Sequence, residues 1–213
     1  MALLSKKAAR TVLYRILAMY PDATTELNYD TPFHLLCAVI MSAQTTDKQV
    51  NKLTPEFFEH YPDALALSQA SIEEIELYIS SIGLYHAKAR NLKKTATILV
   101  EQFNGQVPDR KADLLQLAGV GIKTANVVLA EIYHIPAIAV DTHVARIAKK
   151  FKIVAANATP EQVEQRLESI LPQEDWVRAH HAMIMFGRYT MTARAQNQDP
   201  YSYLPPLKKE DLS

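Results

Sequence analysis

Hydrophobic residues recur at the spacing of an α-helix along nearly the whole sequence, and this pattern restricts the fold more than any other feature. In the first segment, for example, Ala9, Leu13, Ile16, Leu17 and Tyr20 fall on a single helical face. No stretch of useful length alternates between hydrophobic and polar residues, as a half-buried β-strand would. Glycine is also scarce, with 5 in 213 residues, whereas an all-β fold needs many turns. The sequence therefore predicts an all-α fold.

Helix-start and helix-stop signals divide this pattern into separate helices. Thr31-Pro32 is typical of a helix start, and Ser71 with Glu74 has the spacing of a capping box. We expect helices over residues 9–20, 32–41, 46–60, 71–79, 84–103, 111–117, 120–134 and 142–151, and two more that begin near residues 160 and 175. A chain of this length can form one large domain or two small ones.

The formal net charge is zero, but the basic residues include two blocks that contain no acidic residue. One block holds Lys88, Arg90, Lys93 and Lys94, and the other holds Arg146, Lys149, Lys150 and Lys152. Two such blocks could form a positive face for a polyanion. Two solvated helix faces would give the same pattern, so both interpretations stay open.

The cysteine and histidine content excludes several kinds of site. The single cysteine, Cys37, excludes an internal disulfide and every zinc site that needs two or more cysteines. No two of the 7 histidines have the His-x₃-His spacing of a helical metal site, which argues against metal-dependent chemistry. No stretch reaches about 18 apolar residues, so we expect no membrane partner. The lone thiol and the lack of a signal-peptide pattern predict a cytoplasmic protein.

The segment from Leu117 to Ala125 contains Gly119-Val120-Gly121 between two predicted helices. Such a glycine hairpin exposes backbone N–H groups at a helix start, where a phosphate can approach closely. Lys123 follows in the first turn, where the helix dipole disfavours its protonated form, and a neutral amine can form a Schiff base. An ordinary interhelical turn with a solvated or phosphate-binding lysine is the simpler alternative.

Asp141 follows the apolar run 135–140 and precedes a predicted helix. Its simplest role is that of an N-cap. A carboxylate near Lys123 could instead accept the amine proton and stabilise a developing cation, as the cleavage of a glycosidic bond requires.

Several segments together resemble the helix-hairpin-helix DNA glycosylases, in particular the bacterial endonuclease III family. The segments are 117–125, Val140-Asp141-Thr142-His143, Ser42-Ala43-Gln44-Thr45-Thr46-Asp47, Ile82-Gly83-Leu84-Tyr85 and Gly187-Arg188-Tyr189. They stand in the family's order and spacing, from about residue 6 to residue 194. The resemblance implies a two-lobed all-α fold with the active-site cleft between the lobes. Residues 25–135 would form a six-helix barrel domain that includes the hairpin, and residues 1–24 plus 136–213 a second helical domain.

The resemblance also implies roles for individual residues. Lys123 matches the catalytic lysine and Asp141 the catalytic aspartate. Gln44 matches the residue that fills the space left by an extruded base, and Leu84 matches a wedge that enters the opposite strand. Taken alone, Leu84 could equally be a core leucine at a helix start. The further DNA contacts implied are Gly119, Val120, Gly121, Thr124, His143 and Arg146.

These matches imply a base-excision-repair DNA glycosylase with AP lyase activity that removes oxidised pyrimidines from duplex DNA. The reaction would use a Lys123 Schiff base and cleave the strand by β-elimination. We expect a monomer that acts on double-stranded DNA with damaged bases or abasic sites, in the bacterial cytoplasm at the nucleoid. One alternative is a glycosylase for another lesion (alkylated purine, uracil or mismatch). The other is a catalytically silent DNA-binding module, which the presence of Lys123, Asp141, Gln44 and Leu84 together disfavours.

The sequence departs from the family at its C-terminal end. The family usually binds a 4Fe–4S cluster through four cysteines, but Met191 occupies the first ligand position and no cysteine follows Cys37. Because thiolates supply the bonds of such a cluster, we expect no cluster and no cofactor. If the tail packs in its place, Tyr201, Tyr203, Leu204 and Leu207 should be buried.

Overall fold

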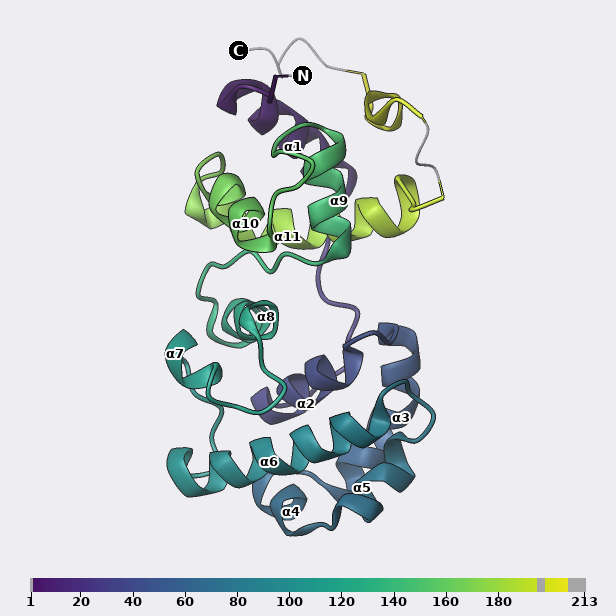
Figure 1. Cartoon of the computed structure of the whole chain (residues 1–213), viewed down its shortest axis with the longest axis vertical. Helices are drawn as coiled ribbons and strands as arrows, with labels where there is room; N and C mark the ends of the chain where they lie inside the picture. Colours follow the sequence, from purple (N-terminus) through teal and green to yellow (C-terminus); the bar gives the residue numbers. More distant parts are fainter. Residues whose placement is uncertain (1, 195–197, 207–213) are drawn as a thin grey trace. The chain divides into compact units, whose positions relative to one another are not determined.

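The computed structural model describes residues 2–194 and 198–206, and every regular element within these ranges is helical (Figure 1). The α-helices are α1 (Lys6–Met19), α2 (Pro32–Ser42), α3 (Asp47–His60), α4 (Ala64–Gln69), α5 (Ile72–Ile79), α6 (Tyr85–Phe103), α7 (Lys111–Leu114), α8 (Ile122–Tyr133), α9 (Thr142–Lys150), α10 (Pro160–Glu168) and α11 (Trp176–Met185). Two 3₁₀ turns, η1 (Gln173–Asp175) and η3 (Pro200–Tyr203), and a π-helical segment, η2 (Phe186–Thr190), complete the set. The predicted all-α fold is confirmed. Within the described ranges, no helix is long and apolar enough to cross a membrane.

The chain divides into two compact units, each with its own hydrophobic core. The central unit comprises residues 26–135 and contains α2 to α8. The terminal unit joins the described residues up to 25 to those from 136 onward, and contains α1 and α9 to α11. From the sequence, we expected these boundaries after residues 24 and 135, and they lie after residues 25 and 135.

Helix α2 is the most deeply buried helix of the central unit. All of its residues from Phe33 to Met41 are buried, because the helix is apolar on every side. Thr31 begins the helix by accepting a hydrogen bond from the backbone N–H of His34, and Pro32 occupies the first turn, as predicted. The capping box of Ser71 and Glu74 at the start of α5 is also confirmed.

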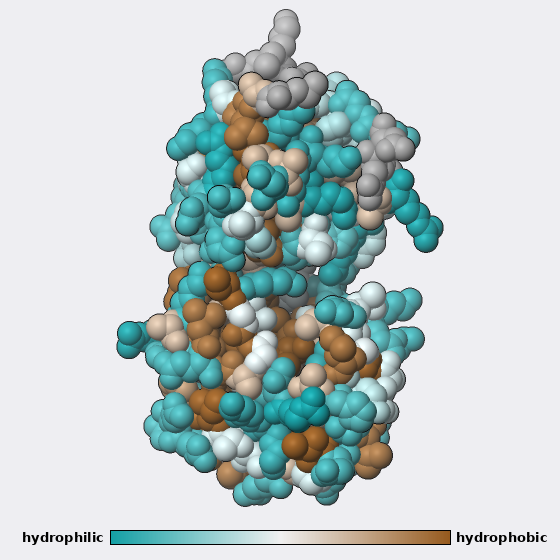
Figure 2. Space-filling view, in the orientation of Figure 1, coloured by the Kyte–Doolittle hydropathy of each residue, from teal (hydrophilic) through white to brown (hydrophobic). Residues whose placement is uncertain are grey.

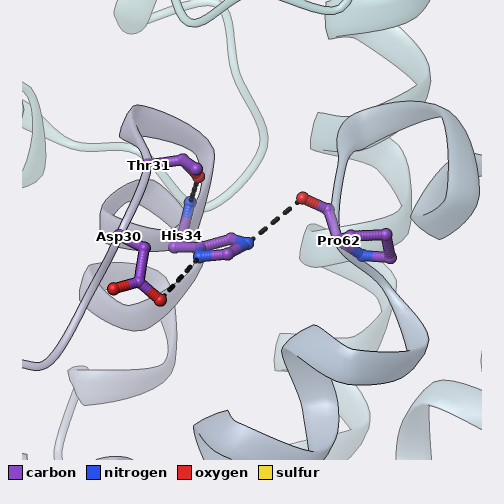
Figure 3. Close-up of polar contacts among 4 residues, drawn as sticks. All are labelled: Asp30, Thr31, His34 and Pro62. Atoms are coloured by element: carbon purple, nitrogen blue, oxygen red, sulfur yellow. Dashed lines mark hydrogen bonds and ion pairs between the residues drawn. The ribbon is translucent and has the colours of Figure 1, made fainter.

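A buried histidine connects α2 to the segment that follows α3 (Figure 3). His34 Nε2 lies 3.1 Å from the carbonyl oxygen of Pro62, and the ring stacks on Phe58 at a centroid distance of 4.0 Å. Its Nδ1 atom lies 4.0 Å from the exposed carboxylate of Asp30. The stacking and the bond to Pro62 hold α2 against the end of α3.

Helix α1 packs with the C-terminal half of the chain, beside α9 and α11 (Figure 1). Its buried face shares a core with residues of α9, α11 and η2; the members include Val12, Leu13, Ile16, Leu17, Val144, Ile147, Met183 and Phe186. Arg10 Nε donates to the carbonyl of Ile170 at 2.8 Å, and Arg166 Nη2 donates to the carbonyl of Leu4 at 3.0 Å. Apolar burial and two arginine–carbonyl hydrogen bonds therefore hold the two sequence segments in one unit.

The described part of the tail packs only in part as expected. Leu204 is buried in the core of the terminal unit, and Tyr203 is half-buried. Tyr201 was expected to be buried but is 42 % exposed, because its ring touches Phe151 edge-on and leaves the other side to solvent. Leu207 lies outside the described residues.

Two stretches differ from the predicted helices. Helix α4 was not predicted, because six residues give too few turns for a hydrophobic period to show. The predicted helix 111–117 ends at Leu114, and the helix predicted to begin at residue 120 begins at Ile122. The hairpin turn between α7 and α8 is therefore longer than predicted.

Candidate functional site

The loop between α2 and α3 presents Gln44 in a strained conformation. Its φ of 55° is left-handed, a region that residues other than glycine rarely adopt, and its side chain is exposed. The chain is fixed on both sides, because the N–H of Thr45 bonds the carbonyl of Ser42 and the side chain of Thr46 caps α3. Conformations of this kind persist where surrounding structure enforces them, often at functional sites.

Leu84, directly before α6, is strained in the same way. Its φ is 61°, and 57 % of the residue is exposed. The alternative that Leu84 is a core leucine is therefore wrong. Its carbonyl accepts hydrogen bonds from the N–H groups of Ala87 and Lys88, which begin the helix. An exposed apolar side chain on a fixed backbone has the form that a DNA wedge requires.

The hairpin between α7 and α8 uses its two glycines differently. Gly119 has a φ of 77°, and a β-carbon there would lie 2.8 Å from Nδ2 of Asn91. At Gly121, the N-cap of α8, a β-carbon would meet nothing within 4 Å. Gly119 is therefore required by the protein's own packing, whereas the bare backbone at Gly121 leaves room for something outside the chain.

Two further hairpin residues, Val120 and Thr124, are buried or half-buried within the central unit. The side chain of Val120 is buried, and its N–H donates to the carbonyl of Leu117 at 3.2 Å. Thr124 is half-buried in the first turn of α8. Direct DNA contacts from Val120 and Thr124 stay predictions.

Lys123 is the second residue of α8, and it is exposed. The helix start carries no side-chain cap and no acidic residue in its first turn, so the positive end of the helix dipole is not neutralised there. Ile122, directly before the lysine, is 40 % exposed, and the central unit shows several apolar surface patches in Figure 2. The surrounding residues therefore leave the Lys123 side chain open to solvent.

In the terminal unit, Asp141 is the N-cap of α9. Its Oδ1 accepts a hydrogen bond from the N–H of Val144 at 2.8 Å, so the simplest predicted role is confirmed. The cap uses only Oδ1 of the carboxylate, and Oδ2 takes no part in it. The side chain is half-buried at the start of the helix.

Arg146 and His143 face the segment of η2. Arg146 Nη2 donates to the carbonyls of Gly187 and Met191 at 2.8 and 2.9 Å, and lies 3.3 Å from His143 Nδ1. Burial lowers the pKa of the Arg146 guanidinium, and the nearby charge of Asp141 opposes this shift. A β-carbon on Gly187 would lie 2.8 Å from Cβ of His143, which explains the glycine. These contacts fix the segment, and DNA contacts from Arg146 and His143 stay predictions.

The two basic blocks are only partly available to a polyanion. Lys88 is buried, and the amine of Lys93 donates to the carbonyls of Ser68 and Ala70 at the end of α4. Arg90 and Lys94 are exposed, as are Lys150 and Lys152 in the other block.

The residues of this chain do not fit an iron–sulfur cluster. Cys37 lies on α2 in the central unit, where burial raises the pKa of its thiol and disfavours the thiolate that binds metal. Met191, at the first ligand position implied by the resemblance, is buried in the hydrophobic core of the terminal unit. Among the described residues, no group of three or more histidine, cysteine or acidic side chains could hold a metal ion.

Comparisons with known proteins show which proteins this chain resembles. The model of the HhH-GPD superfamily of base excision DNA repair proteins matches residues 37–173. Endonuclease III of Escherichia coli K12 is 44% identical over 191 residues, which cover 90% of each chain. A trapped covalent endonuclease III–DNA intermediate aligns with a TM-score of 0.89 at 44% identity over 90% of each chain. A non-covalent endonuclease III–DNA complex aligns with a TM-score of 0.90 at 40% identity, over 99% of this chain and 98% of the other.

Proposed function

This chain belongs to the endonuclease III family of the HhH-GPD superfamily, and from that premise we propose that Lys123 and Asp141 carry out its chemistry. The protein is a base excision repair DNA glycosylase with AP lyase activity. The proposed substrates are duplex DNA with an oxidised pyrimidine and duplex DNA with an abasic site. Because a base inside the stack is out of reach, the damaged nucleotide has to be extruded first.

The proposed reaction begins when the carboxylate of Asp141 accepts a proton from the Lys123 ammonium. The neutral amine attacks C1′ of the sugar, and the base leaves with the electron pair of the glycosidic bond. Opening of the sugar ring gives a Schiff base between Lys123 and C1′. Loss of a proton from C2′ then expels the 3′ phosphate by β-elimination, and water releases the enzyme from the cleaved strand.

The hairpin of the central unit is the observation that carries this proposal. It places an exposed lysine one residue inside a helix whose first N–H groups have no side-chain cap. Gly121 adds no side chain in front of them, so a DNA phosphate can approach these N–H groups beside the nucleophile. Lys123 would therefore face the sugar next to that phosphate.

Borohydride trapping tests the nucleophile. Reduction of the Schiff base should link the protein covalently to abasic DNA, and Lys123→Gln should abolish the adduct while DNA binding persists. Lys94→Gln removes an exposed lysine from α6 and should leave trapping intact. An undiminished adduct in Lys123→Gln would assign the chemistry to another amine.

Measurements of DNA binding, strand nicking and base release separate the alternative functions. Duplex that is bound but never nicked would indicate a DNA-binding module. Cleavage of abasic sites without release of any oxidised pyrimidine would indicate a different target base. A panel of defined lesions in one duplex sequence measures both outcomes.

A further inference from the structure

One face of α6 meets every loop of the central unit for which the resemblance implies a DNA contact. Residues 84, 88, 91 and 95 are spaced by four, three and four, so they lie in one row along a helix. The row begins at the strained Leu84 itself. Each of the other three contacts a different part of the surrounding loops.

Lys88 connects the two strained loops. Its backbone N–H donates to the carbonyl of Leu84 at 3.0 Å. Its side-chain amine donates to Oγ1 of Thr45 at 2.8 Å, directly after Gln44. One residue therefore holds both the wedge loop and the loop with Gln44.

Asn91 and Thr95 hold the hairpin in the same row. Thr95 is fully buried, and its hydroxyl donates to the carbonyl of Ala118 at 2.8 Å. The side chain of Asn91 packs against Gly119 so closely that the glycine cannot be replaced without movement. The three contacts place all these loops on a single rigid helix.

The burial of Lys88 is unfavourable for stability alone. The residue is 3 % exposed, and desolvation lowers the pKa of its amine. Among the described residues no carboxylate pairs with this amine, and its partner is a neutral hydroxyl. A buried cation without a counter-charge is costly, and an apolar side chain of similar length would avoid that cost. A requirement for loop geometry accounts for the lysine.

We infer that Lys88 is a positioning residue that holds the Gln44 loop in register with Leu84, so that both side chains enter the DNA in one step. This inference rests on the proposed function, in which base extrusion precedes the chemistry. Lys88 contacts no reacting atom in this account. Its loss should therefore impair extrusion and leave the Lys123 chemistry intact.

Two substrates distinguish these effects under single-turnover conditions. Lys88→Met keeps the aliphatic stem and removes the amine, and should slow excision of an oxidised pyrimidine by roughly 10-fold to 100-fold. Cleavage of a preformed abasic site, which has no base to extrude, should fall much less. Thr45→Val should give the same split, and Thr45→Ser, which keeps the hydroxyl, should restore excision. The double variant Lys88→Met/Thr45→Val should be no worse than either single variant.

Lys93→Met is the matched control. Lys93 is also bonded within the fold, but to carbonyls at the end of α4 and not to a DNA-facing loop. Replacing Lys93 should lower the melting temperature without changing the ratio of the rate of base excision to the rate of abasic-site cleavage. Lys88→Met should keep or raise the melting temperature, because a desolvated charge is removed.

Amide hydrogen exchange in the free protein gives a readout that needs no activity. The N–H of Thr45 should exchange faster in Lys88→Met and Thr45→Val than in wild type or Lys93→Met. If wild type fails to nick or trap DNA, the proposed function fails, and this exchange measurement still decides whether Lys88 holds the loop. Unchanged exchange, or excision at the wild-type rate by a folded Lys88→Met, would overturn the inference. So would an equal loss on both substrates.

Discussion

At Gly119 the left-handed backbone and the side chain of Asn91 both exclude a β-carbon, whereas at Gly121 neither does. Gly119→Ala should therefore lower the free energy of unfolding by about 1–3 kcal/mol through strain. Gly121→Ala, at an N-cap where glycine is preferred to alanine, should cost no more than about 1 kcal/mol but weaken DNA binding, because the methyl group stands where a phosphate would approach. Urea denaturation and fluorescence anisotropy with labelled duplex measure the two effects. Equal destabilisation by both variants would contradict this division of roles.

Asp141 combines a structural and a proposed chemical role in one side chain. Asp141→Asn keeps an oxygen that can accept from the N–H of Val144, so the cap and the melting temperature should be retained. The uncharged amide cannot accept the proton of Lys123, and base excision should fall by about 10²-fold to 10⁴-fold. Asp141→Ala removes the cap as well and should cost a further 0.5–2 kcal/mol, roughly, of stability. Excision at the wild-type rate by Asp141→Asn would leave the residue with its structural role alone.

Among single residues, the sequence predicted those whose role depends on local chain geometry. The N-cap role of Asp141 follows from its place before a helix, and the left-handed turn at Gly119 follows from its place in the hairpin, although the contact of Gly119 with Asn91 does not. The engagement of Lys88 and Lys93 could not be predicted in this way, because their partners, Thr45 and Ser68, are 43 and 25 residues away. A block of basic residues shows the charge and not the direction in which each side chain points. The spacing of Lys88, Asn91 and Thr95 behind Leu84 was the one signal available, and it was missed.

At the scale of elements, helices with explicit start signals were predicted best. The capping box placed the start of α5, and Thr31-Pro32 that of α2. The hairpin helices were predicted too long, because residues 115–117 continue the helical pattern although the chain already turns through successive backbone hydrogen bonds. A turn stabilised by Thr95 from another helix leaves no mark in its own sequence.

The capping box of α5 predicts a pH-dependent stability. Hydrogen bonds from the backbone and side chain of Ser71 lower the pKa of Glu74 below its ordinary value. A carboxyl whose pKa is lowered on folding contributes stability above its unfolded pKa and loses it as the pH falls through the folded pKa. Wild type should therefore melt at a higher temperature than Glu74→Gln at pH 7, and the difference should shrink below about pH 4. A difference independent of pH would show that the charge of Glu74 is not involved.

At the scale of the whole molecule, each unit has its own core, and the terminal unit combines both ends of the chain. Its core includes Met191, which stands at the first cluster-ligand position implied by the resemblance. Met191 is buried, and Arg146 fixes the carbonyls of residues 187 and 191. Leu204 adds a buried side chain from the tail, and Arg15 donates to the carbonyl of Pro205. Hydrophobic packing and arginine–carbonyl hydrogen bonds stabilise this region.

The last prediction is that this region is stable without iron. One thiol, buried in the other unit, cannot supply the ligands of a four-iron cluster. The purified protein should contain no stoichiometric iron, and a strong chelator should change neither its melting temperature nor its cleavage of abasic DNA. If side-chain packing takes over the structural role, Leu204→Ala should cost about 2–5 kcal/mol, the usual range for a buried leucine. Tyr201→Ala, at a site that is 42 % exposed, should cost clearly less. Iron that copurifies and is needed for stability would contradict this prediction, and a Leu204→Ala variant as stable as wild type would show that the tail does not support the unit.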